Sequence, residues 1–532
     1  MGYVRKVSGL TKEASFIDAF ALGFMNNAMI WNYWVQSSWG LYLFPGADLI
    51  WSSVLAMIWC MAGIGLVYGI LGGSMPRSGG EYIYLSRIFN PGVGLVISFL
   101  NALFVPMAWL WTLPPTYAHP GISAIFGLVN MPEKSASFFD PQVVFIVSTI
   151  SILYGFLVIG IGGLKVYKIN QRIIFTVSML ILIAILGVGA PHSNQEFIQA
   201  WNAASKQYSS LGYYELINAV KATGFPVSAT INWWDTIALA TTVCSWWAAY
   251  GFIISFIGGE IKRPQRNIIL AQTLSVLVPG IGMILVALMM YNTFGREFTV
   301  AAAYIDNMGG LQGYAMPWTP IYYTIASIFT NNTTLLVFMG LGLILCSILW
   351  MPMQYICTTR ALFAWSMDGL GPTWFSEIHT RTHSPLKVAI LTFIGAELGL
   401  IGYLYVPAIG HILGGLGVTL GQFILTFSTV AIGCMIFPYL RKVRSVWETS
   451  PHNWKLGPIP LATIAGIIML SYLWVGIFFF IKSPALAPAW EIWLPMYAVV
   501  LIAGIIWYYV YKWKARKKGI DIALLSTTLP PE

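Results

Sequence analysis

Apolar segments of about 20 residues recur along the whole chain, and they constrain its fold more than any other feature. Each is long enough to cross the ~30 Å hydrocarbon core of a bilayer as a helix. We place twelve of them, at Phe16–Phe44, Leu49–Leu71, Val93–Leu113, Val143–Ile161, Ile173–Ala190, Thr236–Gly259, Ile268–Tyr291, Leu335–Phe363, Val388–Val406, Ile412–Tyr439, Leu461–Ile481 and Ile492–Tyr511. Because 58% of the residues are hydrophobic and only 9% are charged, a set of soluble domains is excluded. Backbone in lipid must satisfy its own hydrogen bonds, so the segments predict an all-α polytopic membrane protein with 12 transmembrane helices.

The basic residues alternate between the two sides of this arrangement. With the N-terminus in the cytoplasm, 23 of the 28 lysines and arginines fall on the cytoplasmic side, and the remainder are Lys134, Lys206, Lys221, Arg296 and Lys482. This bias follows the positive-inside rule and predicts that both termini are cytoplasmic in a protein of the cell membrane. The net charge of +9 therefore reflects orientation in the bilayer, and no nucleic-acid partner is expected.

The sixth segment is apolar, yet its sequence is poorly suited to a continuous helix. It contains Ser245, Gly251, Ser255, Gly258 and Gly259, and each glycine costs roughly 1 kcal/mol relative to alanine in a helix interior. Backbone that leaves the helix within a membrane must be buried in protein or line a cavity. The composition is consistent both with a broken helix at a binding site and with small residues that allow close helix packing.

The first segment is longer than a span requires. Its 29 residues would extend ~43 Å as a helix, and it contains Asn26, Asn27, Asn32 and Gln36, which are costly in lipid. A broken helix explains both features, as does a tilted helix whose asparagines form hydrogen bonds with neighbouring helices.

Three cytoplasmic motifs resemble those of amino acid permeases of the amino acid-polyamine-organocation superfamily. Residues Glu260 to Asn267, EIKRPQRN, match the E-V-K-N-P-x-R-N signature after the sixth span. Residues Met75 to Tyr84, MPRSGGEYIY, with Arg87, resemble the M-P-x-A-G-G-x-Y-x-Y-x-x-R loop. Residues Thr359 to Pro372, TRALFAWSMDGLGP, resemble the pattern that ends the eighth span. The chain departs from the family at Ser366-Met367 and in lacking a G-S-G turn in the first span.

The resemblance implies a five-plus-five inverted-repeat fold of the LeuT-like kind with two further C-terminal helices. The implied divisions are a cytoplasmic N-terminus (1–15), a first repeat (16–190), an extracellular loop (191–235), a second repeat (236–440), two extra spans (441–511) and a cytoplasmic tail (512–532). The first and sixth spans are then counterparts, both interrupted at the midplane of the membrane.

The resemblance also implies where a substrate would bind. The carboxylate of an amino acid would meet free N–H groups near Asn27 to Asn32, and its ammonium would meet freed carbonyls around Ala248 to Gly251, because helix ends carry opposite partial charges. Trp246 occupies a position where the family often has an aromatic residue in contact with substrate. The predicted substrate-binding residues are Asn27, Met29, Ile30, Asn32, Trp246, Ala249, Tyr250 and Gly251.

The coupling ion stays open between H⁺ and Na⁺, as does exchange without an ion. Ser178 occupies the position of a lysine that some proton-coupled relatives carry, and Ser347 is a candidate sodium ligand. Glu397 lies within the ninth span, where an ionisable group suggests function, although the family architecture favours a structural role. The five cysteines and six histidines lack metal-ligand spacing, so no metal, cofactor or enzyme activity is expected.

These features predict a secondary active transporter of amino acids that works by alternating access. A polyamine or organic-cation exchanger of the same fold is the alternative, and it would require acidic residues near Trp246, where the sequence places none. An ion channel or a polytopic membrane enzyme ranks lower, because neither a selectivity element nor a catalytic cluster is evident. The expected partners are a small amino acid substrate and the lipid bilayer, and the oligomeric state stays open.

Overall fold

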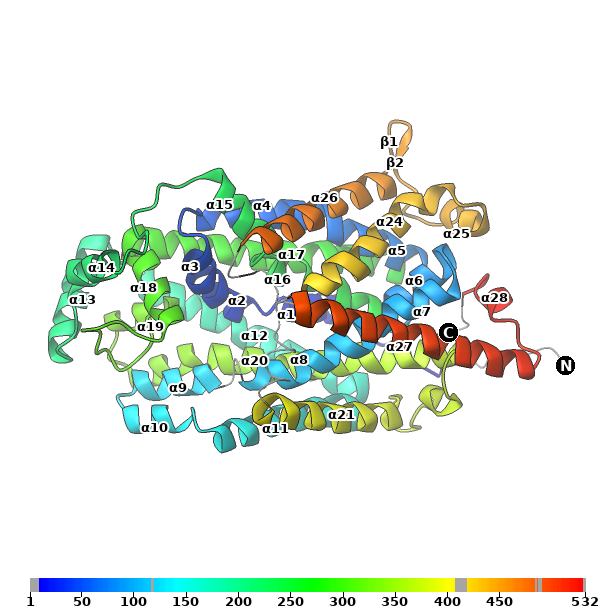
Figure 1. Ribbon diagram of the computed structural model, residues 1–532, viewed down its shortest axis with the longest axis horizontal. Coiled ribbons are helices and arrows are strands. Elements are labelled where there is room, and N and C mark those ends of the chain that lie inside the picture. Colours follow the sequence, from blue (N-terminus) through cyan, green and yellow to red (C-terminus); the bar gives the residue numbers. More distant parts are fainter. Residues whose placement is uncertain (1–8, 116–118, 407–418, 484–485, 487–489, 530–532) are drawn as a thin grey trace.

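The computed structural model describes residues 9–115, 119–406, 419–483, 486 and 490–529. Its long helices run side by side along the longest axis of the molecule (Figure 1). The elements of the predicted spans are α1 (Phe16–Asn26), α2 (Met29–Val35), η1 (Gln36–Gly40), α3 (Leu41–Leu43), α4 (Leu49–Cys60), η2 (Met61–Gly65), α5 (Leu66–Ser74), α7 (Pro91–Ser98), η3 (Phe99–Phe104), α8 (Val105–Leu113), α11 (Pro141–Phe156), η5 (Leu157–Ile161), α12 (Gly163–Gly189), α15 (Trp233–Thr241), α16 (Ser245–Ala248), η6 (Tyr250–Phe256), α17 (Pro264–Met289), η8 (Met290–Phe294), α20 (Thr333–Met367), α21 (Leu386–Tyr405), η11 (Gln422–Phe427), α24 (Ser428–Ile436), α26 (Leu461–Lys482) and α27 (Trp490–Lys517).

Shorter elements lie between the spans. They are α6 (Glu81–Ile88), α9 (His119–Leu128), α10 (Pro132–Ser137), α13 (Asn194–Gln207), α14 (Tyr213–Ala222), η7 (Gly258–Glu260), α18 (Arg296–Met308), α19 (Tyr322–Ala326), η9 (Ser327–Phe329), η10 (Thr373–Ser376), η12 (Phe437–Tyr439), η13 (Arg441–Val443), α25 (Arg444–Glu448), the antiparallel strands β1 (Lys455–Leu456) and β2 (Ile459–Pro460), and α28 (Ile522–Leu525).

The described residues contain ten helices long and apolar enough to cross a membrane, and an eleventh span if the bent pair of Trp233–Thr241 and Ser245–Phe256 is counted as one. The first predicted segment is not among them, because α1 and α2 are separate helices and neither is long enough to span alone. A polytopic helical membrane protein is confirmed, while the count of twelve and the inverted repeat stay predictions. The predicted tenth span begins at Ile412, and its residues 412–418 lie outside the described part.

One helix boundary differs clearly from the sequence-based expectation. The fifth span was expected from Ile173, whereas α12 begins ten residues earlier, at Gly163. The added turns contain Lys165, Lys168 and Arg172, and lysine and arginine are good helix formers. Hydropathy therefore located the apolar part of the helix and missed the part that projects beyond it.

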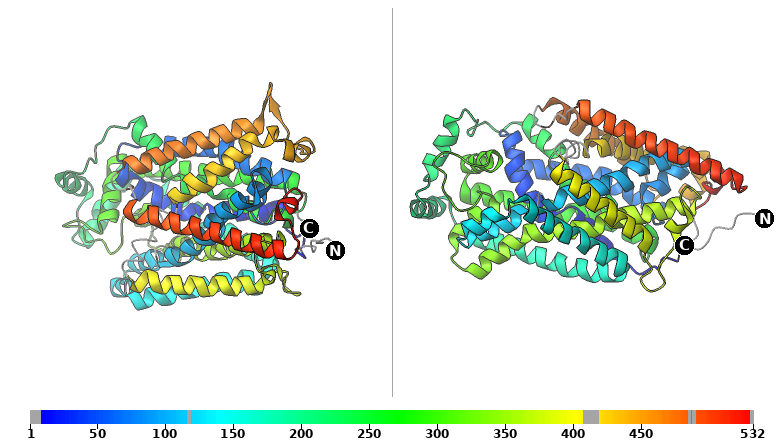
Figure 2. Two further views of the ribbon diagram at one scale, coloured as in Figure 1. Left: turned by 45° about the vertical axis from the view of Figure 1, so that its right-hand side comes forward. Right: turned by 60° about the horizontal axis from the view of Figure 1, so that its bottom comes forward.

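The two ends of the bundle differ in character. The helices α13, α14, α18 and α19 gather at one end, while the described parts of the chain nearest the two termini lie at the other (Figures 1 and 2). The segment 191–235, expected as an extracellular loop, and the segment 292–334 supply that helical cap. In the interior of the bundle, α1 packs against α17, η6, α12 and α20, which places the first span at its centre.

Candidate functional site

The first span is interrupted near the middle of the bundle. Helix α1 ends at Asn26, Ala28 has a left-handed backbone conformation with φ of 43°, and α2 begins at Met29. A left-handed non-glycine residue costs on the order of 1–3 kcal/mol, so the surrounding structure must hold it there. The Asn32 side chain does so in part, because its Nδ2 donates to the carbonyl of Asn27 at 2.6 Å and to that of Ala28 at 3.3 Å.

The sixth span is interrupted at a matching level. Helix α15 ends at Thr241, and the chain bends by 42° before Ser245, where α16 forms a single turn and η6 continues from Tyr250 as a 3-10 helix. Gly251 allows the second half to approach α17, since a Cβ at this position would lie 2.6 Å from Ser275 Oγ. The glycine thus serves close packing, and it does so beside an actual break in the helix.

The two interruptions meet through asparagine side chains. Asn26 Nδ2 donates a hydrogen bond to the carbonyl of Tyr250, and Asn27 Nδ2 donates to the carbonyl of Ser275 on α17. The Oδ1 atoms of Asn26, Asn27 and Asn32 are buried and have no hydrogen-bond partner among the described residues. These amide oxygens are acceptors, and buried acceptors at a helix break are suited to a ligand that carries N–H donors.

A small cavity lies beside this junction. It measures about 10 Å³, which is room for about one water molecule and far too little for an amino acid. Its lining consists of Asn26, Asn101, Val105, Pro106, Trp109, Tyr250, Phe252, Ile253, Gln354, Cys357 and Gln422. The structure therefore represents a closed conformation, in which admission of a substrate requires helices to move.

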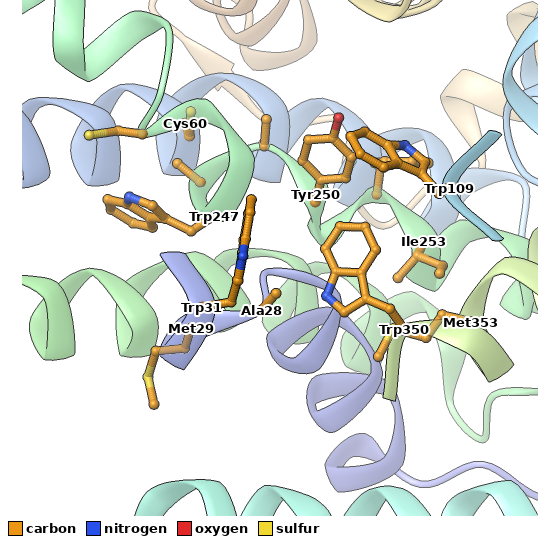
Figure 3. Packing of buried hydrophobic residues seen from close by; sticks show 14 of the residues in the cluster. Ala28, Met29, Trp31, Cys60, Trp109, Trp247, Tyr250, Ile253, Trp350 and Met353 are labelled. Carbon is orange, nitrogen blue, oxygen red and sulfur yellow. The ribbon is translucent and has the colours of Figure 1, made fainter. Parts of the chain in front are cut away.

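Three tryptophans stack beside the cavity. The Trp246 ring stacks on those of Trp31 and Trp39, with centroid distances of 5.6 Å and 5.3 Å and interplanar angles of 20° and 21°. Trp246 Nε1 also donates to Thr419 Oγ1 at 3.1 Å. Figure 3 shows Ala28 at the junction of α1 and α2, with the Trp31 ring standing close to it. We call these three residues the tryptophan stack.

The eight predicted substrate-binding residues are not all directed towards the cavity. Tyr250 lines it, and Trp246 belongs to the tryptophan stack. Met29 points away from Trp31 (Figure 3), and its Sδ lies within 3.3 Å of where a Cβ on Gly282 of α17 would be. Ile30 packs in the same way against Gly342 of α20. In this conformation only the backbones of these two residues are near the break.

Sequence reasoning missed several residues of the cavity, including Asn101, Gln354 and Gln422. Tyr250 Oη donates to Gln422 Oε1 at 2.9 Å, and Gln422 Nε2 donates to Asn101 Oδ1 at 2.6 Å. The signal was available, because a polar amide within an otherwise apolar span usually faces protein or a cavity. The same reasoning that applies to the asparagines of the first span applies to Asn101, Gln354 and Gln422 in the third, eighth and tenth spans.

The candidate coupling residues are dispersed. Ser178 is buried on α12, and its hydroxyl has no partner among the described residues. The side chain of Ser347 lies outside the described part of α20. Glu397 on α21 is half-buried and accepts a hydrogen bond of 3.0 Å from Thr149 Oγ1 on α11. Within the described residues, no cluster of three or more His, Cys, Asp or Glu is positioned to hold a metal.

We expect Glu397→Gln to leave transport within about twofold of the wild type, because the amide keeps an acceptor for Thr149 and the residue does not line the cavity. The measurement is uptake as a function of pH in reconstituted vesicles. A loss of the pH dependence in this variant would show instead that Glu397 participates in coupling.

The three motifs meet at the end of the bundle that holds the termini. Arg360 of the third motif forms a two-pronged ion pair with Glu260 of the first, with Nε–Oε1 and Nη2–Oε2 distances of 3.1 Å and 3.0 Å. Arg87 of the loop motif pairs with Asp368 at 2.7 Å. The carbonyl of Glu260 also accepts a hydrogen bond from the N–H of Ala14 at 2.9 Å. These contacts close that end of the bundle beneath the cavity.

At the opposite end lies a cavity of about 530 Å³, whose lining includes Asp306 of α18 and four aromatic residues, Trp34, Phe139, Tyr314 and Trp318. Asp306 accepts hydrogen bonds from Ser38 Oγ and, at 2.6 Å, from Trp34 Nε1. Burial raises the pKa of Asp306, and these two hydrogen bonds oppose the shift. The rings of Trp34 and Trp31 meet edge-on with their centroids 6.2 Å apart, so Trp34 connects the Asp306 carboxylate to the tryptophan stack. No contact between Asp306 and Trp246 is observed, and Trp34 and Trp31 lie between them in this chain of contacts.

The described helices define a polytopic helical membrane protein, and a hydrogen bond from Asn26 to the Tyr250 carbonyl joins the interruptions in its first and sixth spans. A sequence model of the family described as Amino acid permease matches residues 15–506, and the chain belongs to that family. The superfamily expected from the three motifs is thereby confirmed.

Two curated relatives from Arabidopsis thaliana are similar to the chain. "Cationic amino acid transporter 2, vacuolar" is 26% identical over 397 residues, covering 73% of this chain and 54% of the relative. "Cationic amino acid transporter 3, mitochondrial" is 24% identical over 396 residues, covering 73% of this chain and 57% of the relative. The chain thus spans a little over half the length of the curated relatives that it matches.

Proposed function

We propose that the protein is a secondary active transporter that carries amino acids across its membrane by alternating access, with substrate bound where the first and sixth spans are interrupted. The observation that carries this proposal is the hydrogen bond from Asn26 to the carbonyl of Tyr250, which joins the two breaks beside a closed cavity. Exposed helix ends supply N–H groups for a carboxylate and carbonyls for an ammonium. An amino acid carries this pair of charges on one carbon.

The closed cavity is compatible with such a cycle. The tryptophan stack lies on one side of the site, and the contacts of Glu260 lie on the other. Opening either side alone would expose the junction to one compartment at a time. The distribution of basic residues supports placing both termini in the cytoplasm, and the cell membrane stays our proposed location.

The test is reconstitution in proteoliposomes with a mixture of labelled amino acids and amines, measuring uptake and counterflow with pH and sodium gradients imposed separately. Counterflow of at least one amino acid is expected. Ion currents without transport of any solute would favour a channel, and chemical conversion of a solute would favour an enzyme. Uptake of amines without amino acids would favour the organic-cation exchanger.

Asp306 supports the alternative that the protein exchanges organic cations. It also favours cationic amino acids among the possible amino acid substrates. A half-buried carboxylate in a cavity that also contains four aromatic side chains attracts ammonium or guanidinium groups through charge and cation–π contacts. Both relatives are named as cationic amino acid transporters. We therefore include cationic amino acids among the proposed substrates.

We expect Asp306→Asn to lower the apparent affinity for labelled arginine about three- to fivefold and to leave that for leucine unchanged, because a partly solvated charge pair contributes up to about 1 kcal/mol. Glu133→Gln on α10 is the matched control, since it removes an exposed outer carboxylate that does not line the cavity. Equal effects of the two variants on arginine would indicate a general surface charge and not a site at Asp306.

A further inference from the structure

Glu81 is a buried carboxylate that the proposed transport site does not use. It begins α6, which lies between the second and third spans, and its exposed fraction is 1%. One carboxylate oxygen, Oε1, accepts a hydrogen bond from Asn101 Nδ2, while Oε2 is buried and has no partner among the described residues. Burying a charged carboxylate with an unsatisfied oxygen costs free energy, so a functional role for Glu81 would explain why this residue is placed there.

A line of hydrogen bonds connects Glu81 to the substrate site. Tyr250 Oη donates to Gln422 Oε1, Gln422 Nε2 donates to Asn101 Oδ1, and Asn101 Nδ2 donates to Glu81. Every donor in this line points towards the carboxylate, so each bond polarises the next. The line begins at the break in the sixth span and crosses from η11 to η3 before it reaches α6.

The backbone next to Glu81 is bonded to the same broken span. The N–H of Gly79 donates to the carbonyl of Phe256 at 3.1 Å, and the N–H of Gly80 donates to that of Ser255 at 3.3 Å. Ser255 and Phe256 belong to η6, the second half of the interrupted span. Movement of η6 during transport would therefore disturb the environment of Glu81 directly.

The surroundings of Glu81 favour its neutral form. Burial raises its pKa from the ordinary value of 4.5 to about 7, against the lowering effect of the hydrogen bond from Asn101. The titratable side chains that interact with it are those of Tyr68 on α5, Tyr84 on α6 and Cys357 on α20. Of the charged groups on α6 and the elements packed against it, Arg87 binds Asp368, Arg360 binds Glu260 and Lys442 of η13 binds the carbonyl of Phe89, while Arg441 of η13 is exposed.

We propose that Glu81 is the proton-binding site that couples the substrate site to the pH gradient. While the bundle is closed, the carboxyl holds a proton taken from solution as an O–H bond. When η6 moves and water reaches α6, the carboxyl becomes hydrated, returns towards its ordinary acidity and releases that proton to the same compartment as the substrate. The proposal rests on the proposed transport of amino acids, because it identifies the ion that accompanies the substrate.

The test compares wild-type protein with Glu81→Gln in proteoliposomes, using labelled amino acids that the wild type exchanges. Glutamine mimics the protonated carboxyl and keeps an oxygen for Asn101. We expect an inward proton gradient to stimulate wild-type uptake at least fivefold and to have no effect on the variant. We expect the counterflow rate of Glu81→Gln at equal pH to stay within about twofold of the wild-type rate, because counterflow needs only the substrate-loaded carrier. Glu397→Gln is the matched control and keeps the full stimulation.

Stimulation of Glu81→Gln by the gradient would overturn the proposal, as would the absence of stimulation in wild-type protein that still shows counterflow. In both cases amino acid transport itself would stand, whereas a lack of counterflow for every solute would remove the proposed function. If the variant does not fold, substrate-driven proton uptake by wild-type vesicles, followed with an entrapped pH dye, decides the question. Uptake of protons together with substrate supports the proposal, and substrate entry without protons overturns it.

Discussion

Arg360→Ala is expected to lower the free energy of unfolding by about 3–5 kcal/mol, because it leaves the Glu260 carboxylate buried without its counter-charge. The side chains of Arg360 and Glu260 are only 0% and 2% exposed, and the pair is held by two parallel hydrogen bonds. The pair also joins α20 to the end of the sixth span, so uptake should be lost together with stability. Thermal unfolding of the purified protein in detergent measures the first effect.

The control for this prediction is Lys387→Ala. Lys387 forms an ion pair with Glu377 in which the side chains are 61% and 54% exposed, and such pairs contribute about 0–1 kcal/mol. Replacing both buried partners, as in Glu260→Met with Arg360→Met, should recover much of the lost stability, since no charge is then left unpaired. Similar unfolding temperatures for Arg360→Ala and Lys387→Ala would show that the buried pair is not important for stability.

The span pattern could be predicted from the sequence, because the requirement to cross lipid acts on about 20 consecutive residues at once. The irregularity of the first and sixth spans was also evident, from Asn26 and Asn27 in one and Gly251 in the other. The position of the first break was harder to predict. It falls at Ala28 in a left-handed conformation, where a glycine would ordinarily be expected. Hydrogen bonds from Asn32 help to hold that conformation, and they depend on the folded arrangement.

The contacts that close the site depend on positions distant in the sequence. Arg360 and Glu260 are 100 positions apart, and Asn101 and Gln422 are 321 apart. Each of the three motifs indicated the family, yet none revealed which residue of another motif it would meet. Side-chain direction was equally inaccessible, because Met29 and Ile30 are next to the break in sequence and still pack against neighbouring helices.

Trp246→Ala is expected to weaken substrate binding at least tenfold, which corresponds to about 1.4 kcal/mol. Trp246 lies one turn before Tyr250, and Thr419 is a common neighbour, at 3.1 Å from Trp246 Nε1 and 3.5 Å from Tyr250 Oη. A substrate at the break would therefore lie against the Trp246 ring when the cavity opens. An aromatic face contributes about 0.5–2 kcal/mol to binding a cationic group, and it also packs against aliphatic side chains. The apparent affinity in uptake assays is the measurement.

Trp39→Ala separates substrate contact from the stacking itself. It removes a stacking partner of Trp246 whose ring centroid is 5.3 Å away, and Trp39 is outside the residues at the breaks in either span. If the stack served only to close the outer side of the site, the two variants would alter transport alike, mainly in its rate. If Trp246 contacts substrate, the affinity should fall tenfold in Trp246→Ala and by no more than about twofold in Trp39→Ala. Trp246→Phe, which keeps an aromatic face but loses the bond to Thr419, should then retain most of the affinity.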